Sequence, residues 1–206
     1  MRNPKKRIGV LGGTFNPIHN GHLSLIKVAH EQYDLPLVLV MPTFSTYYKG
    51  ESELLAPQIR LEMVEAACSE ISYAKASDLD IRRGVTTLTA DTIDDLKALG
   101  YEEIFFIIGG DSLLYIDKWV RADYFLKECT ILYSGRLSSG TESVMEKKAE
   151  YLKNTFAADV RPLHMTDVPY SSTEIRKKIR NGESVTEEIP AAVESFIREN
   201  KLYQDV

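Results

Sequence analysis

The sequence of 206 residues contains only two cysteines, one tryptophan and no long apolar run. Cys68 and Cys129 are isolated, without metal-like spacing, which favours free buried thiols in a reducing compartment over a disulfide. No apolar run reaches the ~18 residues of a membrane-spanning helix. The basic residues near the start (Arg2–Arg7) precede an apolar stretch too short for a signal peptide. We therefore expect a cytoplasmic protein with no membrane partner.

Two common nucleotide-binding motifs are also missing. No segment reads Gly-x-x-x-x-Gly-Lys followed by Ser or Thr, which excludes a P-loop. Gly9, Gly12 and Gly13 lack the Gly-x-Gly-x-x-Gly spacing of the dinucleotide fingerprint, which disfavours an NAD-dependent oxidoreductase. The formal net charge of −5 argues against nucleic acid as a partner, while leaving room for a local basic pocket.

What is present is the composition of an ordinary globular α/β protein, 44% hydrophobic and 27% charged. Five strand candidates alternate with helices, the clearest being Leu37–Met41 and Ile104–Ile108. This alternation predicts one parallel, doubly wound sheet with helices on both faces. Right-handed crossovers would bring the loops after the strands to one edge of the sheet. Because no repeat or linker interrupts the chain, we expect one domain over residues 1–206.

The boundaries of the other elements follow from apolar periodicity and turn residues. Helices are predicted over Leu23–Tyr33, Pro57–Glu70 and Ala90–Leu99, where apolar side chains recur at helical spacing. Ala74–Ile81 is predicted as a strand region, and Leu113–Phe125 as one continuous helix that contains the tryptophan.

The segment Gly12–His22 stands between a short apolar strand and the first helix, and it carries two glycines and two histidines. A helix N-terminus offers unpaired N–H groups and the positive end of its dipole to a phosphate, and glycine allows close approach. If the helix begins near Asn20, the imidazoles of His19 and His22 can face one site and stabilise charge that develops on a phosphate. The plain alternative is a strand-to-helix turn that binds nothing.

Two later segments offer further polar groups. Asp111 lies in a second glycine turn after a predicted strand, where its carboxylate could accept a ribose hydroxyl or cap the next helix. Ser171 and Glu174 have the spacing of a capping box, which predicts a helix start. Arg176 follows in the first turns of that helix, where a guanidinium could bind a phosphate with two hydrogen bonds or simply be solvated at the surface.

Gly12–His22 resembles the HxGH signature of the nucleotidyltransferase superfamily, which comprises adenylyl- and cytidylyltransferases with a Rossmann-like fold. The likeness is closest to the bacterial nicotinate-nucleotide adenylyltransferase family and runs nearly the length of the chain. It continues through Gly109–Leu113 with the pair Lys118-Trp119, through Ser171–Arg176, and to the C-terminal segment Phe196–Tyr203. The resemblance implies transfer of AMP from ATP to nicotinate mononucleotide, with release of pyrophosphate, in NAD biosynthesis.

The resemblance also implies a role for each matching residue. His19 and His22 are the catalytic candidates, expected to stabilise the α-phosphate and the leaving group. ATP and a mononucleotide acceptor are the expected partners, and Mg²⁺ is expected on the ATP phosphates, with no metal ligand set in the chain. The expected ATP site comprises Gly12, Gly13, Thr14, Phe15, Gly109, Asp111, Ser171, Ser172, Thr173 and Arg176, and the expected acceptor site comprises Lys49, Thr87, Thr89 and Trp119.

The chain departs from the family pattern at three places. Asn16 stands where the family usually has Asp, Thr46–Lys49 where it has Pro-Pro-His-Lys, and Leu88 where it has a tyrosine on the nicotinate side. The ATP half therefore matches more closely than the acceptor half. Nicotinamide mononucleotide or pantetheine phosphate as acceptor, and a nucleotide-binding domain without turnover, stay open as alternatives, and so does homo-oligomerisation. We expect the acid to be preferred over the amide, with loosened acceptor binding.

Overall fold

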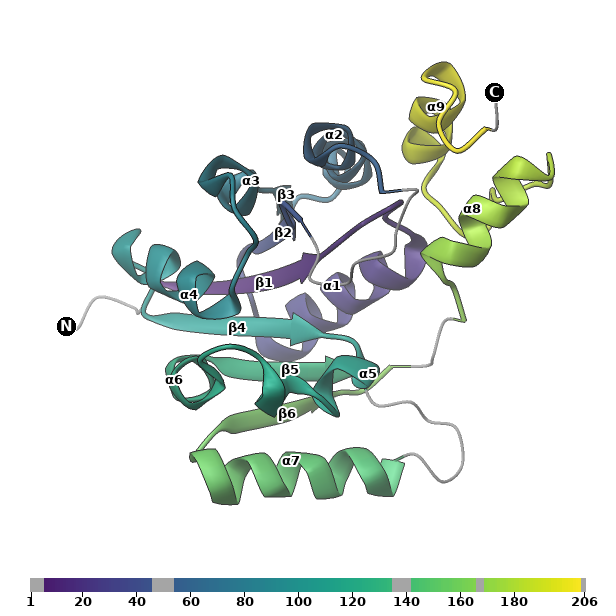
Figure 1. The fold of residues 1–206 in the computed structure, drawn as a ribbon. Helices are drawn as coiled ribbons and strands as arrows, with labels where there is room; N and C mark the ends of the chain where they lie inside the picture. The colour runs from purple at the N-terminus through teal and green to yellow at the C-terminus, as the bar shows by residue number, and fades with distance from the viewer. Residues whose placement is uncertain (1–5, 46–53, 135–141, 166–168, 205–206) are drawn as a thin grey trace.

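A computed structural model describes residues 6–45, 54–134, 142–165 and 169–204. Its centre is a six-stranded sheet in which all neighbouring strands are parallel, in the order β3-β2-β1-β4-β5-β6 (Figure 1). The strands are β1 (Arg7–Gly13), β2 (Val38–Pro42), β3 (Ala74–Ala76), β4 (Glu103–Ile108), β5 (Thr130–Ser134) and β6 (Asp159–Leu163). The predicted parallel, doubly wound sheet is confirmed, with six strands in place of five.

Helices cover both faces of this sheet (Figure 1). They are α1 (Asn20–Tyr33), α2 (Pro57–Cys68), α3 (Leu79–Arg83), α4 (Thr89–Ala98), α5 (Gly110–Leu113), α6 (Ala122–Glu128), α7 (Glu142–Phe156), α8 (Ser172–Arg180) and α9 (Ala191–Glu199), with a 3₁₀ turn η1 (Ile116–Lys118). The strand order reverses between β1 and β4, and at such a switch point open α/β sheets bind their ligands.

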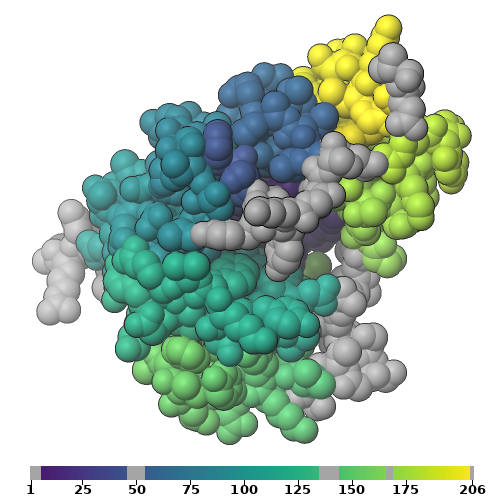
Figure 2. Space-filling view, viewed as in Figure 1, coloured from purple at the N-terminus to yellow at the C-terminus, as the bar shows by residue number. Residues whose placement is uncertain are grey.

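The core consists of two apolar clusters, one on each face. Successive residues of a strand point to opposite faces, so Leu11 and Ile107 enter one cluster while Val10 and Ile108 enter the other. The first cluster is completed by α1, α2, α8 and α9, and the second by α4, α5, α6 and α7. Helix α9 packs against α2 at one end of the molecule (Figure 2), and hydrogen bonds from Ser172 and Arg176 bring α8 to the β1–α1 turn.

The prediction of strand over Ala74–Ile81 is wrong beyond β3, because the chain turns into the short helix α3. Charged side chains account for this change. Asp78 pairs with Arg82 at 3.1 Å, and Asp80 pairs with Arg83 at 3.1 Å. Spacings of four and three residues bring side chains together on a helix and separate them along a strand.

The prediction of one helix over Leu113–Phe125 is also wrong, since α5, η1 and α6 replace it. Trp119 is extended, with φ −72° and ψ 150°, and Arg121 has a left-handed φ of 59°, so neither continues a helix. The Trp119 ring instead packs near Phe125, with 6.1 Å between ring centroids. Because the helix is interrupted here, the Trp119 side chain lines a cavity at the carboxyl ends of the strands.

Two further expectations concern thiols and membranes. Cys68 and Cys129 are both buried and free, as predicted, and burial raises the pKa of the Cys68 thiol to about 11. Within the described ranges, no helix combines the length and the apolar character needed to cross a bilayer.

Candidate active site

Two cavities lie side by side at the carboxyl ends of the central strands. The larger, of about 680 Å³, is lined by Thr14, Thr87, Thr89 and Trp119 over an apolar floor that includes Met41, Phe106 and Ile108. The smaller, of about 350 Å³, is lined by His19, His22 and Tyr170. Both cavities share the walls Gly12, Gly109, Asp111 and Ser112. A ligand can therefore extend from one cavity to the other across the turn after β1 and the turn after β4.

The turn after β1 requires a glycine at position 13 and has Phe15 in the left-handed backbone conformation. A side chain at Gly13 would bring its Cβ to 2.9 Å from the Phe15 ring, a distance that real structures essentially never show. Phe15 itself has a φ of 51° and is buried, so its ring lies beneath the turn and lines neither cavity. Helix α1 begins at Asn20, as expected, which makes His19 the N-cap residue and places His22 in the first turn.

The two histidines form a closely packed pair. Their rings are stacked, with 3.7 Å between centroids and 23° between planes. The backbone N–H of His19 donates to Nδ1 of His22 at 3.2 Å. Since Nδ1 accepts this bond, the proton of a neutral His22 ring lies on Nε2. His22 therefore keeps one ring N–H as a donor, while the Nδ1 atom of His19 is buried and has no partner among the described residues.

Burial sets the charge of this pair. It lowers the pKa of His19 from 6.5 to about 4, because the imidazolium would be desolvated. The pKa of His22 is also held well below its ordinary range, first by burial and then by the neighbouring His19. Without a ligand, both rings are therefore neutral at pH 7. Their N–H groups donate to an anion as dipoles, and an anion bound nearby would favour protonation.

The N-terminus of α8 faces the β1–α1 turn, although not through the predicted capping box. Ser171 is the N-cap residue, but its side chain makes no capping hydrogen bond, so the box of Ser171 and Glu174 does not form. The neighbouring hydroxyl of Ser172 instead donates to the carbonyl oxygen of Pro17 at 2.9 Å. Tertiary contact with the turn thus takes the place of the local contact that the spacing predicts.

Arg176 is buried, with 6% of its surface exposed, so the alternative of a solvated surface arginine is wrong. Its Nη1 donates to the carbonyl oxygen of Asn16 at 2.9 Å. The set of Ser171, Ser172, Thr173 and Arg176 lines neither cavity. Two of these residues, Ser172 and Arg176, contact the β1–α1 turn at Pro17 and Asn16, and the ring of the preceding Tyr170 has its centroid 6.5 Å from that of His19.

Two residues that received no role from the sequence also hold this turn. Arg60 is fully buried, and its guanidinium donates to the carbonyl oxygens of Thr14 at 2.7 Å and Thr43 at 2.6 Å. The hydroxyl of Tyr203 donates to Oδ1 of Asn16 at 2.9 Å. Arg60 falls on the apolar stripe of α2 with Met63, Val64 and Ala67, which indicates burial, but the local sequence does not say which distant carbonyl oxygens it meets.

The acceptor residues predicted from the resemblance are brought together in the larger cavity. Thr87, Thr89 and Trp119 all line it, whereas Lys49 lies outside the described residues. The hydroxyls of Thr87 and of a further lining residue, Thr43, are buried and have no partner among the described residues. Thr89 is the first residue of α4, so its N–H group and that of Ala90 have no partner within the helix. This wall is rich in hydrogen-bond donors and suits an anionic group.

No cluster of three or more His, Cys, Asp or Glu side chains suited to a metal ion occurs among the residues that the structure describes. The carboxylate on the shared wall is that of Asp111, which is exposed and lies in the first turn of α5.

Comparisons with known proteins agree on one family. A family model described as cytidylyltransferase-like matches residues 10–178. A protein of Lachnoclostridium phytofermentans named "Probable nicotinate-nucleotide adenylyltransferase" is 35% identical over 199 residues, covering 96% of this chain and 99% of the relative. A protein of Dehalococcoides mccartyi with the same name is 34% identical over 201 residues, covering 96% of this chain and 97% of that protein.

A solved structure has the same fold. Plasmodium falciparum nicotinic acid mononucleotide adenylyltransferase complexed with NaAD has a TM-score of 0.74 to this chain at 20% identity. The match covers 96% of this chain and 97% of that chain, so the likeness extends over the whole sheet and its helices.

Proposed function

The chain belongs to the cytidylyltransferase-like family and, within it, to the nicotinate-nucleotide adenylyltransferases, and from that premise we propose how its residues carry out the reaction. The enzyme transfers the AMP group of ATP to nicotinate mononucleotide, forming nicotinate adenine dinucleotide and pyrophosphate, in NAD biosynthesis. Both cavities lie on one sheet, so residues 1–206 are proposed as a single nucleotidyltransferase domain.

One observation carries this proposal: a cavity with a histidine pair adjoins a cavity with a donor-rich wall and an aromatic ring, across common walls. ATP would occupy the histidine cavity and the mononucleotide the larger one. An oxygen of the 5′-phosphate then attacks the α-phosphorus in line, and the bond from that phosphorus to the oxygen of the leaving pyrophosphate breaks. A phosphate monoester is already a competent nucleophile, so the protein needs to supply positioning and charge stabilisation rather than a base.

His19 and His22 are proposed as the catalytic donors. Their rings reach the cavity from the N-terminus of α1, where unpaired N–H groups and the helix dipole also favour negative charge. Because the pair is neutral before ATP binds, its N–H groups can stabilise charge as it grows on the α-phosphate and on pyrophosphate. Burial keeps these donors away from water, which strengthens each hydrogen bond.

The remaining ATP contacts are proposed from the turns around the shared wall and from α8. Gly12, Gly13 and Thr14 offer a backbone that a phosphate can approach, and Gly109 with Asp111 is proposed to hold the ribose. Ser171, Ser172, Thr173 and Arg176 are proposed to act on the β- and γ-phosphates from the N-terminus of α8, while Phe15 supports the turn from below. Mg²⁺ carried on the phosphates would neutralise part of their charge and would be held mostly by phosphate and water oxygens.

The acceptor is proposed to bind with its pyridinium ring near Trp119 and its carboxylate near the N-terminus of α4. An aromatic face attracts a cationic ring, and the N–H groups of the first helical turn attract an anion. The hydroxyls of Thr87 and Thr89 add donors on the same wall. Lys49 keeps its proposed role in acceptor binding on the resemblance alone.

The experiment that tests this function is a pyrophosphate-release assay with ATP and each candidate acceptor: nicotinate mononucleotide, nicotinamide mononucleotide and pantetheine phosphate. Release should depend on an added acceptor and be fastest with nicotinate mononucleotide. Release with pantetheine phosphate alone would move the chain to another branch, and binding of ATP without release would leave a nucleotide-binding domain. Two buried free thiols fit the proposed location in the cytoplasm.

A further inference from the structure

A buried carboxylate stands in the wall of the larger cavity and has no place in the reaction described above. Asp80, in α3, lines this cavity, and only 3% of its side chain is exposed. A buried carboxylate is costly unless hydrogen bonds and opposite charge compensate it. The partners that compensate the Asp80 charge therefore indicate which elements this carboxylate holds in place.

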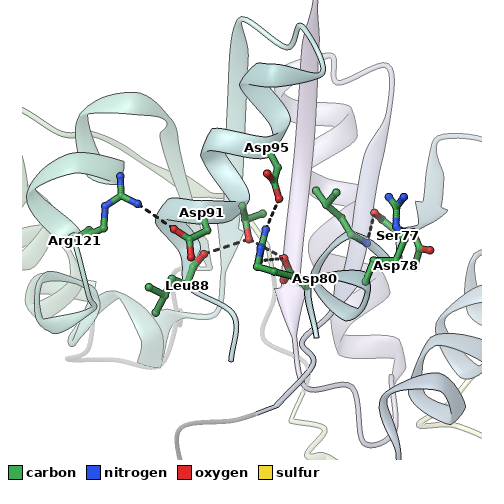
Figure 3. A network of polar contacts seen from close by, with 11 residues as sticks. Ser77, Asp78, Asp80, Leu88, Asp91, Asp95 and Arg121 are labelled. Carbon is green, nitrogen blue, oxygen red and sulfur yellow. Dashed lines mark hydrogen bonds and ion pairs between the residues drawn. The ribbon is translucent and has the colours of Figure 1, made fainter. Parts of the chain in front are cut away.

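Asp80 joins the two helices that border the cavity wall. Its Oδ1 accepts a hydrogen bond from the hydroxyl of Thr92, in α4, at 2.9 Å, and another from Nη1 of Arg83 at 3.1 Å. The second Nη of Arg83 bonds to the carboxylate of Asp95, one turn further along α4. Figure 3 shows Asp80 on α3 and Asp95 on α4, on the two sides of the gap that this network bridges. Two links thus fasten α3 to α4.

The loop between these helices carries the predicted acceptor contacts. Residues 84–88 leave α3 and enter α4, and Thr87 and Leu88 line the larger cavity. The Thr92 hydroxyl also lies 3.4 Å from the carbonyl oxygen of Leu88, so the residue that Asp80 binds touches the end of the loop. On the far side, the hydroxyl of Thr86 bonds to that of Ser45 at 3.0 Å. The loop is thus held at Thr86 by Ser45 and at Leu88 by Thr92, and the second contact also fixes the start of α4.

We propose that Asp80 is a positioning residue for the acceptor: through Thr92 and Arg83 it fixes the start of α4 and the preceding loop, so that the donors of Thr87 and Thr89 meet the mononucleotide. Asp80 acts through these residues and does not react. This inference rests on the proposed function for the identity of the acceptor, and it goes further in naming the network that shapes the acceptor wall. Burial raises the pKa of Asp80, and Thr92 and Arg83 act against that rise, which is the balance expected of a carboxylate held by its partners.

The test compares three variants with a matched control. Asp80→Asn removes the charge, Thr92→Val removes the hydroxyl with little change in volume, and the double variant removes both. Asp78→Asn is the control, because Asp78 is the N-cap residue of the same helix and its side chain makes no capping hydrogen bond. It forms an exposed pair with Arg82, with 47% of its side chain exposed, and it lines neither cavity. For each protein, KM for the mononucleotide, KM for ATP, kcat and the melting temperature are measured.

The proposal expects each single variant to raise KM for nicotinate mononucleotide about tenfold, the effect of losing one charged or buried hydrogen bond. KM for ATP should change by less than about twofold, and Asp78→Asn should behave as wild type. Because Asp80 and Thr92 act as one unit, the double variant should be about as impaired as the worse single variant rather than the product of the two.

A purely structural role predicts a different pattern. Loss of folded protein lowers the melting temperature and the apparent kcat, and it leaves both KM values where they were. That pattern, or equal rises in both KM values, would overturn the proposal, and so would multiplicative effects in the double variant. Failure of the proposed function is seen separately in the wild type: if another acceptor is used, the same KM comparison is made with that acceptor.

Discussion

Replacing either histidine of the pair by alanine should damage turnover far more than ATP binding. His19 is 7% exposed and its ring stacks on that of His22, while Nδ1 of His22 accepts the His19 N–H, so burial, stacking and this bond hold the pair before ATP arrives. A donor that is already oriented acts mostly on charge that appears in the transition state. We expect His19→Ala and His22→Ala each to lower kcat by a factor on the order of 10²–10³, with a far smaller loss of ATP affinity.

The magnitude converts into a measurable difference between two free energies. A loss of 10²–10³ in rate corresponds to about 3–4 kcal/mol of transition-state stabilisation. The rate is followed as pyrophosphate release at saturating substrates, and ATP affinity is measured by calorimetry on the same samples. His30→Ala is a suitable control, because His30 lies on the same helix and stacks on Tyr73, with 3.9 Å between centroids, and lines neither cavity. Equal losses in affinity and in rate would refute the reasoning, since the rings would then bind only the ground state.

Two further predictions follow from the burial of polar groups. The pKa of His19 is about 4 in the folded protein and 6.5 in the unfolded chain, so between these pH values the unfolded chain binds more protons. The contribution of His19 to the free energy of unfolding is therefore fully present above pH 6.5 and is lost as the pH falls to 4. Urea titrations should show that His19→Ala removes about 3 kcal/mol of this dependence, and identical pH profiles would contradict it. Arg176→Lys should raise KM for ATP while the protein stays folded, because one guanidinium nitrogen already bonds to Asn16 and an ammonium cannot reproduce both this bond and the proposed contact with phosphate oxygens. An unchanged KM would place Arg176 outside the ATP site.

The strands of the sheet and the histidine turn are predictable from local sequence. Ile104–Ile108 is a continuous apolar run, as expected for a strand buried on both faces, and it forms all of β4 except Glu103. The two histidines with their glycines mark a strand-to-helix turn, and the structure places them in one cavity. Such features depend on residues close together in the chain, which is why their pattern is informative.

Contacts between distant residues are not predictable in this way. Arg176 looks like a surface residue of an amphipathic helix, yet its partner Asn16 lies 160 residues earlier in the chain. Asp80 falls in a stretch that reads as a strand, and its hydrogen bond with Thr92, 12 residues later in the chain, is visible only in the fold. The break at Trp119 likewise depends on tertiary packing, which overrides the helical periodicity of that segment.

The central claim is tested most directly by the ratio of kcat/KM for nicotinate mononucleotide to that for nicotinamide mononucleotide, at saturating ATP. The acid differs from the amide by a carboxylate, and the wall at the N-terminus of α4 offers donors from Thr87 and Thr89 to meet it. The account predicts a ratio well above one. It also predicts that KM for the acid is higher in this protein than in a Leu88→Tyr variant. A ratio near one, or one that favours the amide, would contradict the account and assign the acceptor site to a different substrate.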